Sequence, residues 1–234
     1  DSNVDAMAES VLFTLSNKYG IKKVDAIAGY SLGGRVALAM KRLSESLTTD
    51  TITPLIQTET KLVLLSASPG ELSGQTAADT ASDSRRIAVD DRLSAGILSH
   101  SNKAVLLPTG SLEDKLLWSK MLERWYSVPI WGALNQTDSL YSEIISKRSA
   151  ALSRRGRDLA MALAQCSPPR NQKEDWSYCS PPHTLFIAGS LDAKYSTIGK
   201  TWSKARGVLF EEIPCVGHAL LAEAPSIVAA LVTD

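Results

Sequence analysis

The sequence of 234 residues lacks an excess of charge of either sign, since 25 lysines and arginines balance 25 aspartates and glutamates. A balanced chain offers no electrostatic footprint for nucleic acid or for an anionic membrane surface. The chain also contains no apolar run near the roughly 18 residues that a membrane span requires. Its three cysteines, at positions 166, 179 and 215, have neither metal nor redox spacing. These absences predict a globular protein of a reducing compartment.

The chain does contain a Gly-x-Ser-x-Gly pentapeptide at residues 29–33, with Ser31 at its centre. The segment before it, residues 23–28, is short and includes valine and isoleucine, as a strand does. Residues 35–43 after it have helical spacing. The apolar face of that helix consists of Val36, Ala39, Met40 and Leu43. This context predicts that Ser31 is the nucleophile-elbow serine of an α/β-hydrolase, with Gly29 and Gly33 keeping Cβ atoms out of the sharp turn.

Strand-like and helix-like segments alternate on both sides of a long, charge-rich helical block. The further strands that we expect are residues 61–67, 184–189 and 208–214, and the further helices are residues 3–18 (ended by Gly20), 194–205 and 224–231. Such alternation predicts a parallel α/β sheet. The block reads as a helical cap inserted into that sheet. The expected parts are an α/β-hydrolase core from the elbow strand onward (1–67), a helical cap (68–182) and the C-terminal strands of the core (183–234).

Two further residues complete a candidate catalytic triad. In this fold an acid and then a histidine follow the serine along the chain, each just after a late strand. Asp192 and His218 stand at those places. A serine hydroxyl needs an imidazole to take its proton, and the imidazole needs a carboxylate to hold its tautomer. His100 and His183 follow no late strand, so we expect structural roles for them.

Several other stretches accompany the elbow. They are residues 29–37 with a Gly-Gly-Arg extension, Ser68-Pro69-Gly70, Arg86 four residues before Asp90, Trp125-Tyr126-Ser127-Val128-Pro129, Lys147-Arg148-Ser149, Gly189-Ser190-Leu191-Asp192-Ala193-Lys194-Tyr195, and residues 213–218. Together they resemble the 2-succinyl-6-hydroxy-2,4-cyclohexadiene-1-carboxylate synthase (MenH) family of α/β-hydrolases. The longer, polar cap is similar to that of the plant members, which form the C-terminal part of the multifunctional phylloquinone-pathway protein PHYLLO. The resemblance covers most of the chain.

The resemblance implies a lyase of phylloquinone or menaquinone biosynthesis that needs no cofactor and no metal. Such an enzyme eliminates pyruvate from a succinylated enolpyruvyl-cyclohexene carboxylate, and its activated serine acts as a base. The substrate is a small polycarboxylate. The plant-type resemblance further implies a chloroplast location and fusion to other quinone-pathway domains upstream; without it, a cytoplasmic location is expected.

Five residues match substrate-binding positions of that family. The arginines Arg35, Arg86 and Arg148 match positions that bind the carboxylates, for which a planar guanidinium is well suited. Tyr30 and Trp125 match positions that line the pocket. Without the resemblance, Arg86 and Arg148 would be read as part of a solvated helix face, and Trp125 as a packing residue.

The chain departs from the family pattern before the elbow. An α/β-hydrolase core normally places several strands there, so roughly 70 residues are expected to be absent at ordinary element lengths. The absent part would include the loop that supplies one oxyanion N–H, the other being the backbone N–H of Leu32. We therefore expect this chain to be a C-terminal piece of a longer protein, or a product that has lost its activity.

Two alternatives stay open at this point. One is a serine hydrolase of the same fold that cleaves an ester or a carbon–carbon bond, against which the three arginines argue because they favour a polyanionic substrate. The other is a catalytically dead interaction or structural module, against which the retained triad residues argue.

Overall fold

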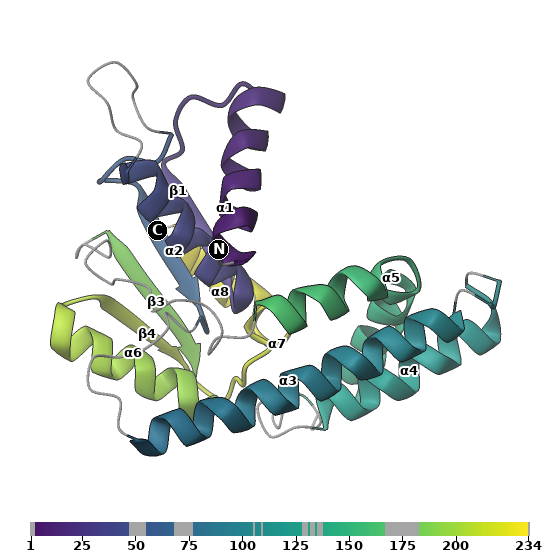
Figure 1. Ribbon diagram of the computed structural model, residues 1–234. Helices are drawn as coiled ribbons and strands as arrows, with labels where there is room; N and C mark the ends of the chain where they lie inside the picture. The colour runs from purple at the N-terminus through teal and green to yellow at the C-terminus, as the bar shows by residue number, and fades with distance from the viewer. Residues whose placement is uncertain are drawn as a thin grey trace.

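The structure, a computed structural model, describes residues 3–46, 55–67, 77–104, 106–108, 110–127, 131, 134, 138–166 and 183–233. Within these residues a four-stranded parallel sheet has helices on both faces, and three long helices project beside the carboxyl ends of the strands (Figure 1).

The sheet consists of β1 (Ala26–Tyr30), β2 (Lys61–Leu65), β3 (Thr184–Gly189) and β4 (Leu209–Ile213), in that spatial order. Every neighbouring pair is parallel. Tyr30 pairs with Leu65, which pairs with Ile187, so the carboxyl ends of β1, β2 and β3 lie nearly level. The side chains of β3 are all buried because strands flank it on both sides and helices cover both faces. Among the described residues, β1 and β4 form the two edges.

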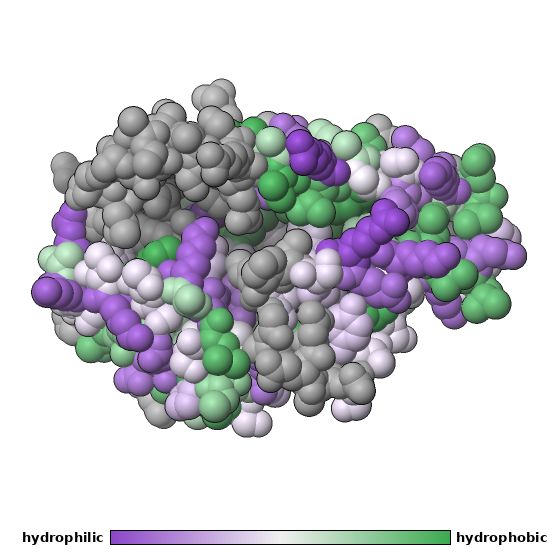
Figure 2. Space-filling view, turned by 90° about the horizontal axis from the view of Figure 1, so that it is seen from below, coloured by the Kyte–Doolittle hydropathy of each residue, from purple (hydrophilic) through white to green (hydrophobic). Residues whose placement is uncertain are grey.

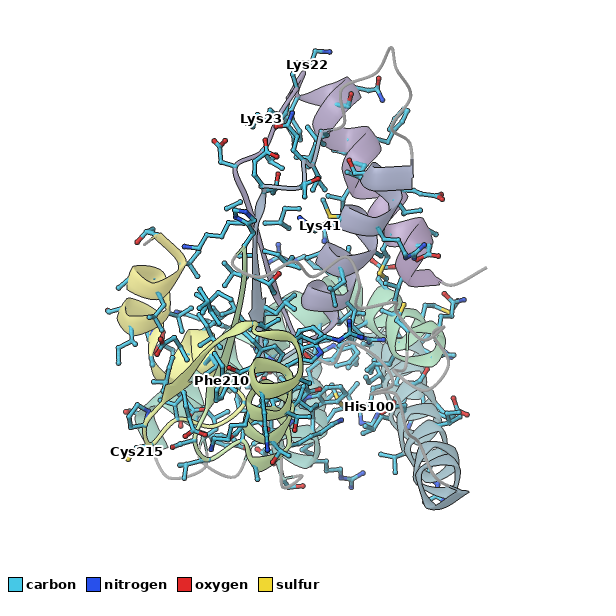
Figure 3. All side chains as sticks on the ribbon, turned by 90° about the vertical axis from the view of Figure 1, so that its left-hand side faces the viewer. Lys22, Lys23, Lys41, His100, Phe210 and Cys215 are labelled. Atoms are coloured by element: carbon cyan, nitrogen blue, oxygen red, sulfur yellow. The ribbon has the colours of Figure 1, made fainter. Side chains whose placement is uncertain are left out.

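Helices on opposite faces bury the two sides of the sheet. They are α2 (Leu32–Ser46) and α6 (Ala193–Arg206) on one side, and α7 (Leu220–Glu223) and α8 (Pro225–Thr233) on the other. Figure 3, which views the sheet edge-on, has α2 and α8 on opposite sides of it. The Trp202 ring of α6 packs edge-on against Phe186 of β3, with ring centroids 5.8 Å apart.

The expected N-terminal helix is present as α1 (Asn3–Phe13), which continues as one π-helical turn, η1 (Thr14–Lys18). Gly20 follows with a φ of 65°, a left-handed conformation that ends the helix. The α1 helix packs on α2 rather than on the sheet. Its Val4 and Ala8 meet the predicted apolar face of α2, including Ala39 and Met40.

The projecting helices are α3 (Ala77–Ala104), α4 (Leu112–Tyr126) and α5 (Asp138–Gln165). They share an apolar cluster in which Trp118 and Tyr126 are fully buried. We call these helices, with Trp131 and Leu134 between α4 and α5, the cap. The cap cluster also includes Ala219 and Ala222, so the cap packs against the core at α7.

Lys41 of α2 has a fully buried side chain beside the sheet (Figure 3). Its Nζ donates to the carbonyl oxygens of Thr58 at 3.0 Å and of Gln57 and Thr60 at 3.4 Å each. A buried ammonium group is tolerated only when its donors are satisfied in this way. The contacts fix the chain that leads into β2 to the helix behind the elbow.

Several boundaries differ from those expected, and the start of β1 and the end of β2 have a visible cause. The β1 strand begins at Ala26 rather than at residue 23, because the N–H of Val24 donates to the carbonyl of Leu55 outside the ladder. The β2 strand ends at Leu65, since Ser66 has a left-handed φ of 42°. The short α7 was not expected, because four residues are too few to show a helical period.

The described surface includes apolar side chains at the end of the cap where α3 leads into α4. Leu106, Leu112 and Leu116 are exposed there, and apolar residues gather at that end in Figure 2. Within the described ranges, no helix is both long and apolar enough to cross a bilayer.

Candidate active site

The proposed nucleophile occupies the turn between the elbow strand and the helix behind it. Ser31 has a φ of 51°, follows the last residue of β1 and precedes Leu32, the first residue of α2. Its N–H donates to the carbonyl of Leu65 at 2.9 Å, which continues the parallel ladder beyond the strand. A left-handed serine costs conformational energy, and such strain is typical of a nucleophile held at the top of a sheet.

Two glycines make this turn possible, and one of them is not the residue expected. A Cβ on Gly29 would lie 2.4 Å from the carbonyl oxygen of Gly33, so no side chain fits there. A Cβ on Gly33 would meet nothing within 4 Å, so the steric role predicted for Gly33 is wrong. The second required glycine is Gly34, whose Cβ would lie 2.2 Å from the Cβ of Ala67. The helix therefore approaches the chain after β2 through Gly34.

Asp192 and His218 form a buried pair. Asp192 Oδ2 lies 2.6 Å from His218 Nδ1, and both side chains are almost completely shielded from solvent. Asp192 is also the N-cap of α6, where its Oδ1 accepts the N–H of Tyr195 at 3.4 Å. The helix cap holds the carboxylate in place, and the carboxylate can hold the imidazole in the tautomer with its proton on Nδ1.

Close contact between two loops brings this pair together. A Cβ on Gly189 would lie 2.1 Å from the carbonyl oxygen of Val216, so only glycine allows the chain after β4 to lie against the end of β3. The N–H of Leu191 donates to that Val216 carbonyl at 2.9 Å. Ser190 Oγ accepts the N–H of Cys215 at 2.9 Å. Two hydrogen bonds thus join the loop before Asp192 to the loop before His218.

Tyr30 joins the elbow strand to the base. Its hydroxyl donates to the carbonyl oxygen of His218 at 2.9 Å, and the two ring centroids lie 5.4 Å apart. Burial raises the pKa of Tyr30 far above its usual value, and the positive charge of Arg148 offsets this only in part. The hydroxyl therefore remains a donor at any physiological pH.

Ser31 Oγ has no hydrogen bond to His218 among the described side chains. In serine enzymes without substrate this bond is often long and tightens only when the substrate binds. The contact between Tyr30 and His218 nevertheless places the base beside the residue that precedes Ser31. Ser31, Asp192 and His218 thus all lie at the end of the sheet where the strands have their carboxyl ends.

Two more aromatic rings flank the imidazole of His218, and neither was predicted to belong to the site. Trp131 of the cap lies edge-on at 4.9 Å between ring centroids, and Tyr195 of α6 lies at 5.0 Å. The sequence signal for Tyr195 was its place at the end of the seven-residue motif, 189–195, that contains Asp192. The signal for Trp131 was its place two residues after Pro129. Aromatic walls exclude water from the base.

Of the three predicted substrate arginines, the structure describes two side chains. Arg35 is buried on α2, and its Nη2 donates to the carbonyl of Cys166, just after α5. Arg148 of α5 is exposed, with its guanidinium 5.4 Å from the centre of the Tyr126 ring. Arg86 belongs to α3, but its side chain lies outside the described residues.

Electrostatics connects Arg148 to the elbow. Burial raises the pKa of Tyr30 and of Tyr126, and the charge of Arg148 lowers both. A charge has this effect only over a short range in a shielded environment. Arg148 thus lies over the ring of Tyr126, and its charge acts on Tyr30 beside His218, where an anionic group of a ligand could meet it.

The structure also places the other residues that were singled out from the sequence. Trp125 is half-buried on α4 against the cap cluster. Leu32 is the first residue of α2, so its N–H is one of those that a helix leaves without an internal acceptor. His100 accepts or donates at Gly96 within α3, consistent with a structural role, and the backbone carbonyl of His183 accepts the N–H of Leu62. Residues 68–70 lie outside the described ranges.

Comparisons with known proteins define the fold. No protein-family model matches the sequence, and no curated protein sequence matches it. Among solved structures, MenH from S. aureus superposes with a TM-score of 0.66 at 20% identity, over 98% of this chain and 73% of that one. A malate-bound thermophilic esterase from Thermogutta terrifontis superposes with a TM-score of 0.54 at 18% identity, over 100% and 71% of the two chains. The chain has the α/β-hydrolase fold, as expected.

Proposed function

We propose that the chain carries the active site of a lyase that eliminates pyruvate from a succinylated enolpyruvyl-cyclohexene carboxylate, giving 2-succinyl-6-hydroxy-2,4-cyclohexadiene-1-carboxylate. The observation that carries the proposal is the buried Asp192–His218 pair at the end of the sheet where the elbow serine stands, with the Arg148 guanidinium over the ring of Tyr126. The motifs of the sequence and the similarity to a MenH structure support this assignment.

In this reaction His218 takes the hydroxyl proton of Ser31, and the serine oxygen removes a proton from a ring carbon of the substrate. The electrons of that C–H bond form the new ring double bond. The ring C–O bond breaks with its electrons on oxygen, and pyruvate leaves as its enolate, which takes the proton that His218 holds and becomes the ketone. Asp192 stabilises the imidazolium that forms meanwhile. No water is consumed, and no acyl-enzyme is needed.

Binding the substrate requires partners for its carboxylates, because an unpaired carboxylate loses more on leaving water than it gains. We assign this role to Arg148, which lies over Tyr126, and, on the basis of the resemblance, to Arg86 and Arg35. Arg35 would bind substrate in addition to Cys166, which a guanidinium with five donors allows. Tyr30 and Trp125 would line the pocket, and the N–H of Leu32 would meet negative charge that develops on oxygen.

Replacing Arg148 tests this assignment. We predict that Arg148→Gln raises the KM for the tricarboxylate substrate by roughly 10-fold, since an exposed charged hydrogen bond contributes about 1–2 kcal/mol. Its kcat should change little. Arg154→Gln, on the exposed surface of the same helix, is the matched control. Equal KM values for the two variants would remove Arg148 from substrate binding.

The alternative is ester or lactone hydrolysis, which the structural neighbours favour. Besides the Thermogutta esterase they include Est816, described as an N-acyl homoserine lactone degrading enzyme, at 18% identity and a TM-score of 0.52. A hydrolase would release alcohol from p-nitrophenyl esters and pass through an acyl group on Ser31. Turnover of such esters without pyruvate release from the cyclohexene substrate would favour this alternative.

Three further predictions rest on the resemblance to the plant members of the family. Membership of the plant PHYLLO-type group, a chloroplast location and fusion to other quinone-pathway domains are proposals of this kind. Detecting the protein in isolated chloroplasts, within a larger polypeptide, would test all three together.

A further inference from the structure

The backbone around His218 is held by a carboxylate that the sequence analysis did not single out. Glu223 Oε2 accepts the N–H of Gly217 at 2.8 Å, and its Oε1 accepts the N–H of Ala219 at 3.1 Å. One carboxylate thus bonds the chain on both sides of the histidine. The peptide groups of three consecutive residues are fixed, because Tyr30 and the N–H of Leu220 also bond the His218 carbonyl, each at 2.9 Å.

A local structural explanation accounts for part of this arrangement. Ala219 is the N-cap of α7 and has no side-chain acceptor, so Glu223 satisfies an N–H that the helix leaves unpaired. Capping does not account for the second bond, because Gly217 lies outside the helix. The two oxygens span His218, and only a carboxylate offers two acceptors at that separation.

The α7 helix that carries Glu223 also lies where core and cap meet. Leu220 is buried in the core cluster beneath β2 and β3, whereas Ala219 and Ala222 pack into the cap cluster. The chain around His218 is therefore subject to forces from both parts of the molecule. The two bonds of Glu223 would keep the imidazole aligned with Asp192 although the flanking residues pack against different parts of the molecule.

We propose that Glu223 is a positioning residue, which fixes the main chain on both sides of His218 and so keeps its imidazole at Asp192 and beside Ser31. This inference rests on the proposed function only in taking His218 as the base. Catalytic groups lose much of their effect when displaced by about 1 Å, so the tie at Glu223 should influence turnover without touching the substrate.

The sharpest variant is Glu223→Gln, which keeps size and one acceptor. Its amide nitrogen is a donor, so it would face one of the two backbone N–H groups without bonding it. Glu211→Gln is the matched control, since Glu211 is exposed on β4. The first readout needs no substrate: the NMR signal of the proton between His218 Nδ1 and Asp192, in a chain with only three histidines. We expect this signal to shift and broaden in Glu223→Gln and to stay unchanged in the control.

The second readout is kinetic. We expect kcat for pyruvate release to fall by roughly 10-fold or more in Glu223→Gln at unchanged KM, with the His218-dependent limb of the pH profile displaced. An unchanged His218 signal in Glu223→Gln would overturn the inference and leave Glu223 as a helix cap. A changed signal in a protein whose parent releases no pyruvate would support the inference while the proposed lyase activity fails.

Discussion

The ionisation of two tyrosines, the half-buried Tyr30 and the buried Tyr126, affects the stability of the whole chain. Burial raises the pKa of Tyr30 and of Tyr126 above their usual value of 10.0, with Arg148 opposing the shift at both. In the unfolded chain these phenols ionise near that value, whereas in the fold they stay protonated. The folded state therefore binds more protons than the unfolded state above about pH 10.

We predict that the free energy of unfolding falls as the pH rises through 10, by up to about 1.4 kcal/mol per pH unit for each such tyrosine. Tyr30→Phe should lower stability at neutral pH by about 1 kcal/mol, through loss of the bond to His218, and should reduce the alkaline slope. Urea titrations of both proteins between pH 8 and pH 11 measure this. Parallel slopes would contradict the account of Tyr30.

At the scale of elements, the elbow depends on how closely α2 approaches the sheet. Gly29 and Gly34 have backbone or side-chain atoms where a Cβ would stand, and Gly33 has open space. Motif spacing alone cannot make this distinction. The contact of Gly29 is local, but that of Gly34 is with Ala67, a residue beyond β2 that the pentapeptide does not contain.

The three glycines therefore give a matched series. Gly29→Ala and Gly34→Ala should each destabilise the fold by roughly 1–3 kcal/mol or more, because the added methyl group has no space. Gly33→Ala should be neutral or stabilising by up to about 1 kcal/mol, since alanine favours the first turn of α2. Thermal unfolding of the three variants decides the matter. A loss at Gly33 equal to that at Gly34 would show that the approach of helix and sheet is described wrongly.

Features that depend on residues close together in the sequence could be predicted, and features that depend on distant residues could not. The strand 184–189 was predicted at its observed bounds because a short apolar run between polar segments is a local signal. The late positions of Asp192 and His218 followed from chain order within one fold. The close contact at Gly189, the ring of Trp131 and the tie at Glu223 join residues from separate elements, so one-dimensional spacing does not reveal them.

At the scale of the whole molecule, cap and core are joined at more than one place. Arg35 of α2 bonds the carbonyl that follows α5, and the sulfur of Cys166 lies 4.0 Å from that of Met7 in α1. The other junction is α7, next to His218. The candidate site draws residues from both parts, with Ser31 and Asp192 from the core and Trp131 and Arg148 from the cap.

Pyruvate release from the succinylated enolpyruvyl-cyclohexene carboxylate, compared between the parent protein and Ser31→Ala, shows whether the elbow serine takes part in the reaction. Because triad members act as a unit, we expect Ser31→Ala to lower kcat by about 10³-fold or more, and His218→Ala to lower it nearly as much, while thermal unfolding stays cooperative. Pyruvate release by Ser31→Ala at near the parent rate would contradict the account, because the elbow serine would then take no part in the reaction.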